Sequence, residues 1–117
     1  MLPIFSNVQL FLYSTATDMR KSFDGLCGII NNSLNQNPLS GDVYIFINRR
    51  KDRIKLLVWD RYGFWLFYKR LEKGVFQLPL DIDKKTSIQL SQEDLLLLIL
   101  QGIDLNSARK RPRYHRQ

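Results

Sequence analysis

The sequence feature that most constrains the fold is a series of short apolar segments after residue 41, separated by even shorter polar connections. Four segments have the aromatic and β-branched composition of strands: "DVYIFIN" (42–48), "RIKLLVWD" (53–60), "FWLFYKRL" (64–71) and "VFQLP" (75–79). The connections hold three or four residues each: "RRKD" (49–52), "RYG" (61–63) and "EKG" (72–74). Connections this short join antiparallel neighbours, so the sequence predicts an antiparallel meander. Gly63 is the expected residue with a positive φ angle in the second turn.

One strand and one helix are predicted before the meander. "VQLFLYS" (8–14) has strand composition. A stripe of apolar residues at helical spacing then predicts a helix over 18–35, with Thr17 or Asp18 as its N-cap. The stripe consists of Met19, Phe23, Leu26, Cys27, Ile30 and Leu34. "NQNPLSG" (35–41) ends the helix, which we expect to pack across one face of the sheet.

A second helix is predicted near the end of the chain. "DIDKKTS" (81–87) reads as a linker, and Ser91 is the expected N-cap of a helix over "QEDLLLLILQG". The stretch 95–100 is apolar on all sides, which is typical of a helix buried on several sides. Core packing is therefore the favoured interpretation. The alternative is an interface with a partner, formed by Leu95, Leu98, Ile99 and Trp65.

These elements predict an α+β domain. Its antiparallel sheet has four to five strands, with one long helix on one face and the second helix closing the edge or a second core. The domain occupies residues 1–104, and the basic segment 105–117 has no apolar periodicity and is expected to be disordered. The single cysteine, Cys27, is expected to be a buried, inert thiol, because it lies among apolar residues. No apolar run approaches the ~20 residues of a membrane span, so we expect a cytoplasmic protein.

The positive charge is concentrated in two places. The 117 residues carry a net charge of +7, but residues 48–74 hold nine basic and three acidic side chains. Residues 105–117 hold five basic side chains and no acidic one. Such asymmetry is expected of a protein that binds a polyanion. The alternative is a solvated surface with a basic tail.

Aromatic residues are interleaved with these cations. Exposed aromatic rings can stack on bases while cations hold the phosphates. The alternative is that Trp59, Trp65 and Phe67 form a second core under the C-terminal helix. The sequence leaves both interpretations open.

Residues suited to catalysis are scarce. His115 is the only histidine and Cys27 the only cysteine, so neither a zinc site of the usual kind nor a histidine-activated nucleophile is expected in the folded part. Asp81 and Asp83 are the only carboxylate pair at strand-face spacing, and turn formation explains them equally well. No phosphate-binding glycine loop occurs. We therefore expect no enzyme activity, no cofactor and no metal site.

Four stretches together resemble a known family. They are "TDMRKSFDGL" (17–26), "NPLSG" (37–41), "RRKDRIKLLVWDRYGFWLFYKRLEKGVFQLP" (49–79) and "LSQEDLLLLILQGID" (90–104). Their order and spacing over residues ~7 to 104 are similar to those of the short accessory protein of insertion-sequence family sixty-six. That protein is often called Orf2 or TnpB and is unrelated to the RNA-guided nuclease of the same name. Arg61 and Trp65 depart from the residues that are commoner in the family.

The resemblance implies a bacterial mobile element in which a separate, larger protein is the transposase. The chain would then be a helper in transposition, with DNA as its polyanion. The motif positions that the resemblance carries over are Arg20, Lys21, Arg49, Arg50, Asp52, Arg53, Lys55, Tyr68, Lys69, Arg70 and Glu72. These are motif positions and come with no assigned roles.

Two functions follow as hypotheses. The first is a non-catalytic protein that binds duplex DNA, either at element ends or non-specifically, through the basic hairpin and the tail. Its predicted contacts are Arg20, Lys21, Arg49, Arg50, Lys51, Arg53, Lys55, Tyr68, Lys69, Arg70, Arg109, Lys110, Arg111 and Arg113. The second is an adaptor that docks the transposase or another element-encoded accessory protein through the leucine-rich helix. Neither hypothesis involves a membrane or fixes an oligomeric state.

Overall fold

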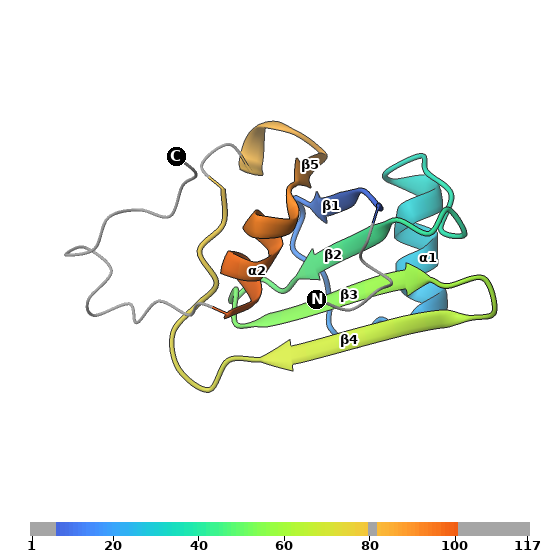
Figure 1. The fold of residues 1–117 in the computed structure, drawn as a ribbon. Helices are drawn as coiled ribbons and strands as arrows, with labels where there is room; N and C mark the ends of the chain where they lie inside the picture. Colours follow the sequence, from blue (N-terminus) through green and yellow to red (C-terminus); the bar gives the residue numbers. More distant parts are fainter. Residues whose placement is uncertain (1–6, 80–81, 101–117) are drawn as a thin grey trace.

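A five-stranded mixed β-sheet lies between two helices in the computed structural model, which describes residues 7–79 and 82–100 (Figure 1). The strand order is β4-β3-β2-β1-β5. The strands are β1 (Leu10–Tyr13), β2 (Val43–Ile47), β3 (Arg53–Trp59), β4 (Phe64–Arg70) and β5 (Ser87–Leu90). The helices are α1 (Phe23–Asn32), α2 (Gln92–Leu100) and the short 3-10 turn η2 (Ile82–Lys84). The α+β prediction is confirmed.

The meander of β2, β3 and β4 is confirmed. Both pairs are antiparallel, with Tyr44 opposite Leu57 and Val58 opposite Trp65. The predicted strand over 75–79 is wrong. Val75 makes only an isolated bridge, and Phe76 turns into the core, where its N–H donates to the Lys51 carbonyl at 2.7 Å.

The prediction of a purely antiparallel sheet is wrong, because β1 pairs in parallel with β2. Helix α1 lies between these two strands in sequence, and a crossover through a helix returns the chain in the same direction. The fifth strand is β5, which pairs antiparallel with β1. It begins at Ser87, the last residue of the predicted linker, and continues to Leu90. It contributes Ile88 and Leu90 to the core at a spacing of two residues, a signal too short to stand out in the sequence.

Helix α1 is shorter than predicted. Its N-cap is Ser22, because Asp18 folds the preceding segment into a turn instead. The Asp18 carboxylate accepts the Arg20 N–H at 2.9 Å, a side-chain contact that competes with helix formation. Beyond the helix, Asn35 adopts a positive φ of 54°. Met19 and Leu34 still pack on the core beneath α1, so the apolar stripe extends through turns at both ends of the helix.

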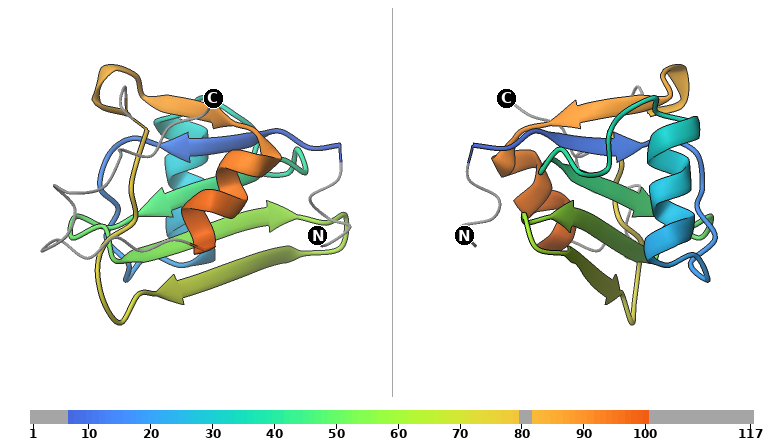
Figure 2. Two further views of the ribbon diagram at one scale, coloured as in Figure 1. Left: turned by 60° about the vertical axis from the view of Figure 1, so that its left-hand side comes forward. Right: turned by 90° about the vertical axis from the view of Figure 1, so that its right-hand side faces the viewer.

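The two helices cover opposite faces of the sheet, and each closes a separate core (Figure 2). The core under α1 contains Leu26, Ile30 and Phe46. Cys27 lies beside it, half-buried, and burial followed by the Asp24 carboxylate raises the pKa of its thiol. A raised pKa keeps the thiol protonated at neutral pH, although the side chain is less buried than the sequence predicts.

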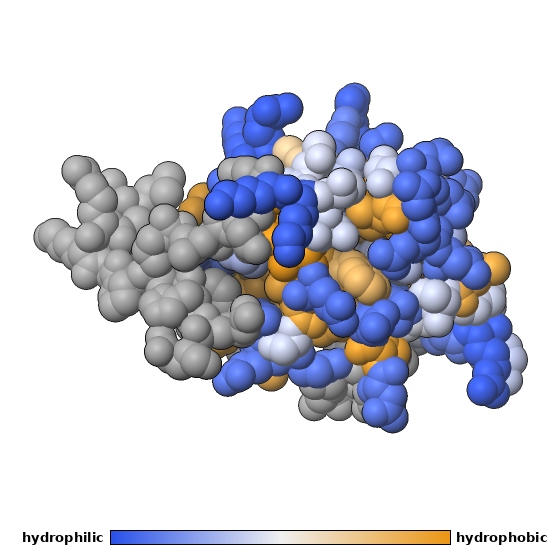
Figure 3. Space-filling model, turned by 90° about the horizontal axis from the view of Figure 1, so that it is seen from above, coloured by the Kyte–Doolittle hydropathy of each residue, from blue (hydrophilic) through white to orange (hydrophobic). Residues whose placement is uncertain are grey.

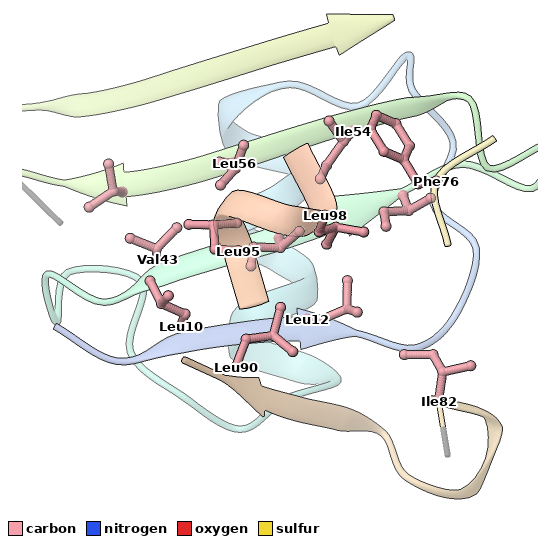
Figure 4. Packing of buried hydrophobic residues seen from close by; sticks show 13 residues of the cluster. Leu10, Leu12, Val43, Ile54, Leu56, Phe76, Ile82, Leu90, Leu95 and Leu98 are labelled. Atoms are coloured by element: carbon pink, nitrogen blue, oxygen red, sulfur yellow. The ribbon is translucent and has the colours of Figure 1, made fainter. Parts of the chain in front are cut away.

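Helix α2 begins as predicted. The Ser91 hydroxyl accepts the Asp94 N–H at 3.0 Å, and the Asp94 carboxylate accepts the Ser91 N–H at 3.1 Å. Leu95 and Leu98 are 2% and 3% exposed and lie against the sheet (Figure 4). Ile99 packs half-buried on the same core. The core interpretation is confirmed for Leu95 and Leu98, whose burial removes them from the predicted partner interface. The helix is not buried on all sides, because Leu96 is 49% exposed.

Several predictions lie outside the described residues. They are the tail 105–117 with its four predicted DNA contacts, the C-terminal boundary of the domain at 104, and the carboxylate pair of Asp81 and Asp83, of which Asp81 and the Asp83 side chain are not described. In the described part, no helix is long and apolar enough to cross a bilayer.

Candidate functional site

The tip of the β2–β3 hairpin is held by a side-chain network around Asn48. Its amide oxygen accepts the N–H groups of Asp52 at 3.0 Å and Arg53 at 2.9 Å, and its amide nitrogen donates to the Asp52 carboxylate at 2.7 Å. Lys51 takes a positive φ of 63° within this turn. Because Asn48, Asp52 and Arg53 are tied together by hydrogen bonds, the basic side chains project from a backbone of defined shape.

The segment that links β1 to α1 docks beside this tip. The Thr17 N–H donates to the Ile47 carbonyl at 2.8 Å, and Thr17 is only 4% exposed. The Lys55 ammonium donates to the carbonyls of Met19 and Lys21 at 2.8 and 2.7 Å. Two segments that carry the family resemblance, 17–21 and 49–53, are therefore neighbours in space.

A hollow of about 520 Å³ lies between these two segments. We call it the cationic hollow. It is lined by Ala16, Thr17, Asp18, Met19, Asn48, Arg49, Arg50, Asp52 and Arg53. Arg49 and Arg50 are exposed at its rim, and in residues 7–79 and 82–100 neither forms an ion pair with a carboxylate. The hollow therefore offers guanidinium groups for a ligand to pair with.

The two carboxylates in the cationic hollow are engaged by neighbours. The Arg20 guanidinium binds the Asp18 carboxylate at 2.7 Å, and this contact lowers the pKa of Asp18 to about 2. Asp18 is therefore ionised at neutral pH and offset by Arg20. The Asp52 carboxylate accepts the Asn48 amide, which orients it within the turn. The arginines thus dominate the part of the hollow that faces solvent.

The cationic surface continues onto β4 through Arg53. A second hollow of about 330 Å³ is lined by Arg53, Tyr68, Arg70 and Glu72. Arg53 donates to the Tyr68 hydroxyl at 3.3 Å, and Arg70 pairs with Glu72 at 2.9 Å. Tyr68 is 51% exposed. An exposed ring beside guanidinium groups is the arrangement that the interleaved sequence led us to expect.

Two of the predicted contacts have other roles. Lys55 is 5% exposed, and its ammonium lies 4.7 Å from the centre of the Tyr68 ring while it binds two backbone carbonyls. Lys69 donates to the Ile99 carbonyl at 2.7 Å, at the C-terminal end of α2, where a cation is favourable. The structure moves Lys55 out of the exposed cationic set and commits Lys69 to α2. Arg20, Lys21 and Lys51 remain exposed.

Sequence reasoning missed the residues that organise this site. The sequence predicts Asn48 as the end of a strand and Thr17 as a helix cap, whereas in the structure each positions the hollow. An asparagine four residues before an aspartate, at the start of a four-residue basic turn, is the signal that could have indicated the turn.

The opposite end of the meander carries aromatic side chains. The Asp60 carboxylate accepts the N–H groups of Tyr62 and Gly63 at 3.1 Å and the indole N–H of Trp65. The positive φ of this turn, 89°, is at Arg61, so the prediction for Gly63 is wrong. The left-handed position of the turn is filled by Arg61, and the Asp60 carboxylate accepts the N–H groups that follow it. Tyr62 is 87% exposed.

The three aromatic residues that the sequence left as either core or exposed platform differ in burial. Phe67 packs on the core under α2, whereas Trp65 is 50% exposed and stacks on it with ring centres 6.0 Å apart. Trp59 is half-buried against Phe64, edge to face. On β4, therefore, Phe67 belongs to the core and Trp65 covers it on the solvent side.

Comparison with known sequences identifies the family. The sequence model of the IS66 Orf2-like proteins matches residues 8–110. The chain belongs to this family. It is 29% identical over 105 residues to uncharacterized protein y4jC of Sinorhizobium fredii, covering 90% of this chain and 87% of that protein. It is 35% identical over 104 residues to uncharacterized protein y4hO of the same organism, covering 89% and 88%. No solved structure matches the chain.

Membership of the IS66 Orf2-like family points to an accessory role in transposition and confirms the resemblance found in the sequence. The match spans the hairpin tip, the segment 17–21 and both helices. The cationic hollow thus lies wholly within the family's extent.

Proposed function

We propose that this protein is a non-catalytic accessory factor of DNA transposition, and that it binds duplex DNA by its phosphates at the cationic hollow. The observation that carries the proposal is the convergence of two distant segments, 17–21 and 49–53, on one arginine-lined hollow. Duplex DNA is the polyanion that an IS66 Orf2-like protein would meet in transposition.

The chemistry of the cationic hollow suits phosphate. Guanidinium groups bind phosphate oxygens with two parallel N–H bonds, which lysine cannot do. The turn that carries Arg49 and Arg50 is already held by Asn48, so little conformational entropy is lost on binding. Tyr68, beside Arg53, would pack against the sugar-phosphate backbone.

A titration of the full chain against duplex DNA tests the proposal. The variant R49A/R50A/R53A removes three guanidinium groups, and R61N removes one exposed guanidinium at the far end of the meander as a control. Asparagine suits the positive φ of 89° at position 61. We expect the triple variant to weaken binding at least tenfold and to reduce the salt dependence by about one phosphate per arginine. Unchanged affinity and salt slope in the triple variant would contradict the proposal.

Duplex from the ends of the element and a scrambled duplex of equal length distinguish sequence recognition from phosphate binding. Equal affinity for both indicates contacts to the backbone alone. A preference for the element ends adds base or shape recognition, which the cationic hollow would then orient.

An adaptor is the second candidate. Its observation is the exposure of Tyr62 and Trp65 at the end of the meander opposite the cationic hollow. Capture of the transposase by the full chain, and its loss in Y62K/W65K, would favour this function. The variant R49A/R50A/R53A serves there as the control, because a protein docked through the aromatic end does not need the arginines.

A further inference from the structure

The outer edge of β4 stands out among the edges of the sheet. β4 has seven residues, none of them fully buried, while the neighbouring β3 has five buried residues in succession. β5, at the other edge of the sheet, is only four residues long. Seen from the β5 side, apolar surface forms small patches separated by hydrophilic side chains (Figure 3). Long exposed edges attract further strands, whereas short ones are protected.

The register of the hairpin fixes which backbone groups of β4 point outward. The Asp60 N–H donates to the Gly63 carbonyl, and the Leu71 N–H donates to the Asp52 carbonyl. Inward and outward pairs alternate along an antiparallel ladder. The N–H and carbonyl groups of Phe64, Leu66, Tyr68 and Arg70 therefore face away from β3, and among residues 7–79 and 82–100 no strand pairs with them.

We propose that this edge binds a second copy of the chain, strand β4 against strand β4, antiparallel and centred on Phe67. Only this register pairs all four outward residues at once: Phe64 with Arg70 of the second copy, and Leu66 with Tyr68. Moving the centre by one residue to either side leaves Phe64 or Arg70 at the end without a partner. The result is a continuous ten-stranded sheet with a two-fold axis between Phe67 and Phe67 of the second copy.

The sequence of β4 is complementary to itself in this register. Its first half, "FWLF", is aromatic and its end, "KR", is cationic. Antiparallel pairing sets Trp65 opposite Lys69 of the second copy and Phe64 opposite Arg70. Each basic side chain then lies beside an aromatic ring on the same face, while Lys69 keeps its bond to the Ile99 carbonyl and Arg70 its pair with Glu72. A parallel arrangement would instead set Lys69 against Lys69 and Arg70 against Arg70. Charge thus selects the antiparallel arrangement of two copies over the parallel one.

The exposure of two side chains of β4 supports pairing at this edge. Trp65 and Tyr68 are half-exposed on opposite faces of β4, and each would gain a neighbour when the sheet continues. The helices α1 and α2 cover the inner strands, and neither of them covers this edge (Figure 2). The dimer would carry one cationic hollow from each copy, at opposite ends of the paired strands. Each would remain exposed, because none of its lining residues belongs to β4.

Sedimentation velocity of the full chain, free of nucleic acid and in high salt, tests the proposal across a concentration series. We expect a monomer–dimer equilibrium. W65K sets like charges face to face at both ends of the pairing, and Y68P removes an outward N–H from the edge. Each is expected to raise the dimer dissociation constant about tenfold or more. Y62K is the matched control, because it exchanges an exposed aromatic for the same charge outside β4 and leaves dimerisation unchanged.

A disulfide cross-link reports the register. In the C27A background, F67C places two thiols at a directly facing, non-hydrogen-bonded pair, whose Cα atoms lie about 4.5 Å apart, within disulfide range. Oxidation is expected to give a covalent dimer for F67C and little for Y62C. A chain that is monomeric throughout, or a dimer that W65K and Y68P leave intact, overturns the proposal. Equal cross-linking at both positions overturns the register. If Y68P does not fold, W65K and the cross-link decide.

Discussion

The two turns of the meander are stabilised by the same kind of hydrogen bond and expose different side chains. At the hairpin tip, Asn48 accepts two backbone N–H groups, and at the far turn Asp60 does the same. Each turn also places a long basic residue at positive φ, Lys51 at 63° and Arg61 at 89°. Yet the tip presents exposed arginines over a hollow, and the far turn presents exposed aromatic rings.

The difference shows which residues the fold needs and which it leaves to function. One polar residue at each turn satisfies the backbone, so the other side chains of the turn are not required for its shape. The tip has an additional brace, because Lys55 ties the segment 17–21 to the sheet beside it. We infer that the tip is the more rigid of the two ends, and the predictions below test that contrast.

The largest effect is expected from removing the brace. K55M should lower the free energy of unfolding by about 3 kcal/mol, because it deletes two hydrogen bonds and leaves the carbonyls of Met19 and Lys21 without their donor. K69M is the control, since Lys69 is half-buried and serves one carbonyl, and about 1 kcal/mol is expected. Urea unfolding of both variants measures the difference. Equal losses would show that the buried lysine does not brace the tip.

The next effect comes from the organising residues of the two turns. N48A should lower the free energy of unfolding by about 1–2 kcal/mol and also weaken DNA binding, although it removes no charge. D60A should loosen the far turn and leave DNA binding unchanged. Binding isotherms at one salt concentration, with urea unfolding of both variants, separate these outcomes. Weakened binding in D60A but not N48A would reverse the comparison.

Features that depend on residues close together in the chain could be predicted from the sequence, and features that depend on long-range pairing could not. Local patterns predicted the meander, the Ser91 cap and the exposed arginines of the tip, because each depends on residues close together in the chain. The direction of β1 and the pairing of β5 depend on contacts such as Leu10 with Val43 and with Leu90. No local periodicity encodes such pairing.

The candidate site shows the same limit. The sequence does not distinguish the basic residues of this stretch from one another. In the structure, Lys55 and Lys69 donate hydrogen bonds to the backbone carbonyls of residues 19, 21 and 99. Arg49 and Arg50 have no such neighbour among the described residues and remain exposed. The role of each cation depends on long-range contacts, so composition could locate the site without choosing its members.

Smaller effects are expected from the positive φ angles. K51G and R61G should each stabilise the protein by about 0.5–1 kcal/mol, because glycine adopts this conformation without the steric cost of a Cβ. Thermal unfolding measures both. K51G should in addition reduce the salt dependence of DNA binding, and R61G should not. Destabilisation by both substitutions would show that these side chains contribute contacts larger than the backbone strain.

The smallest effect concerns two exposed carboxylates, one at each end, whose pKa values are lowered for different reasons. Arg20 lowers the pKa of Asp18 to about 2 from 3.8, whereas the backbone N–H of Tyr62, followed by the Trp65 indole, lowers that of Asp60. A lowered folded-state pKa means that each contributes stability above about pH 4, which is lost as the pH falls through the folded-state pKa. An ion pair is screened by salt, and neutral donors are not. Carboxyl titration by NMR should therefore show the pKa of Asp18 rising with salt or in R20Q, while that of Asp60 stays low. Equal salt responses would mean that the two ends are held by the same kind of interaction, and the contrast between an ionic and a neutral end would fail.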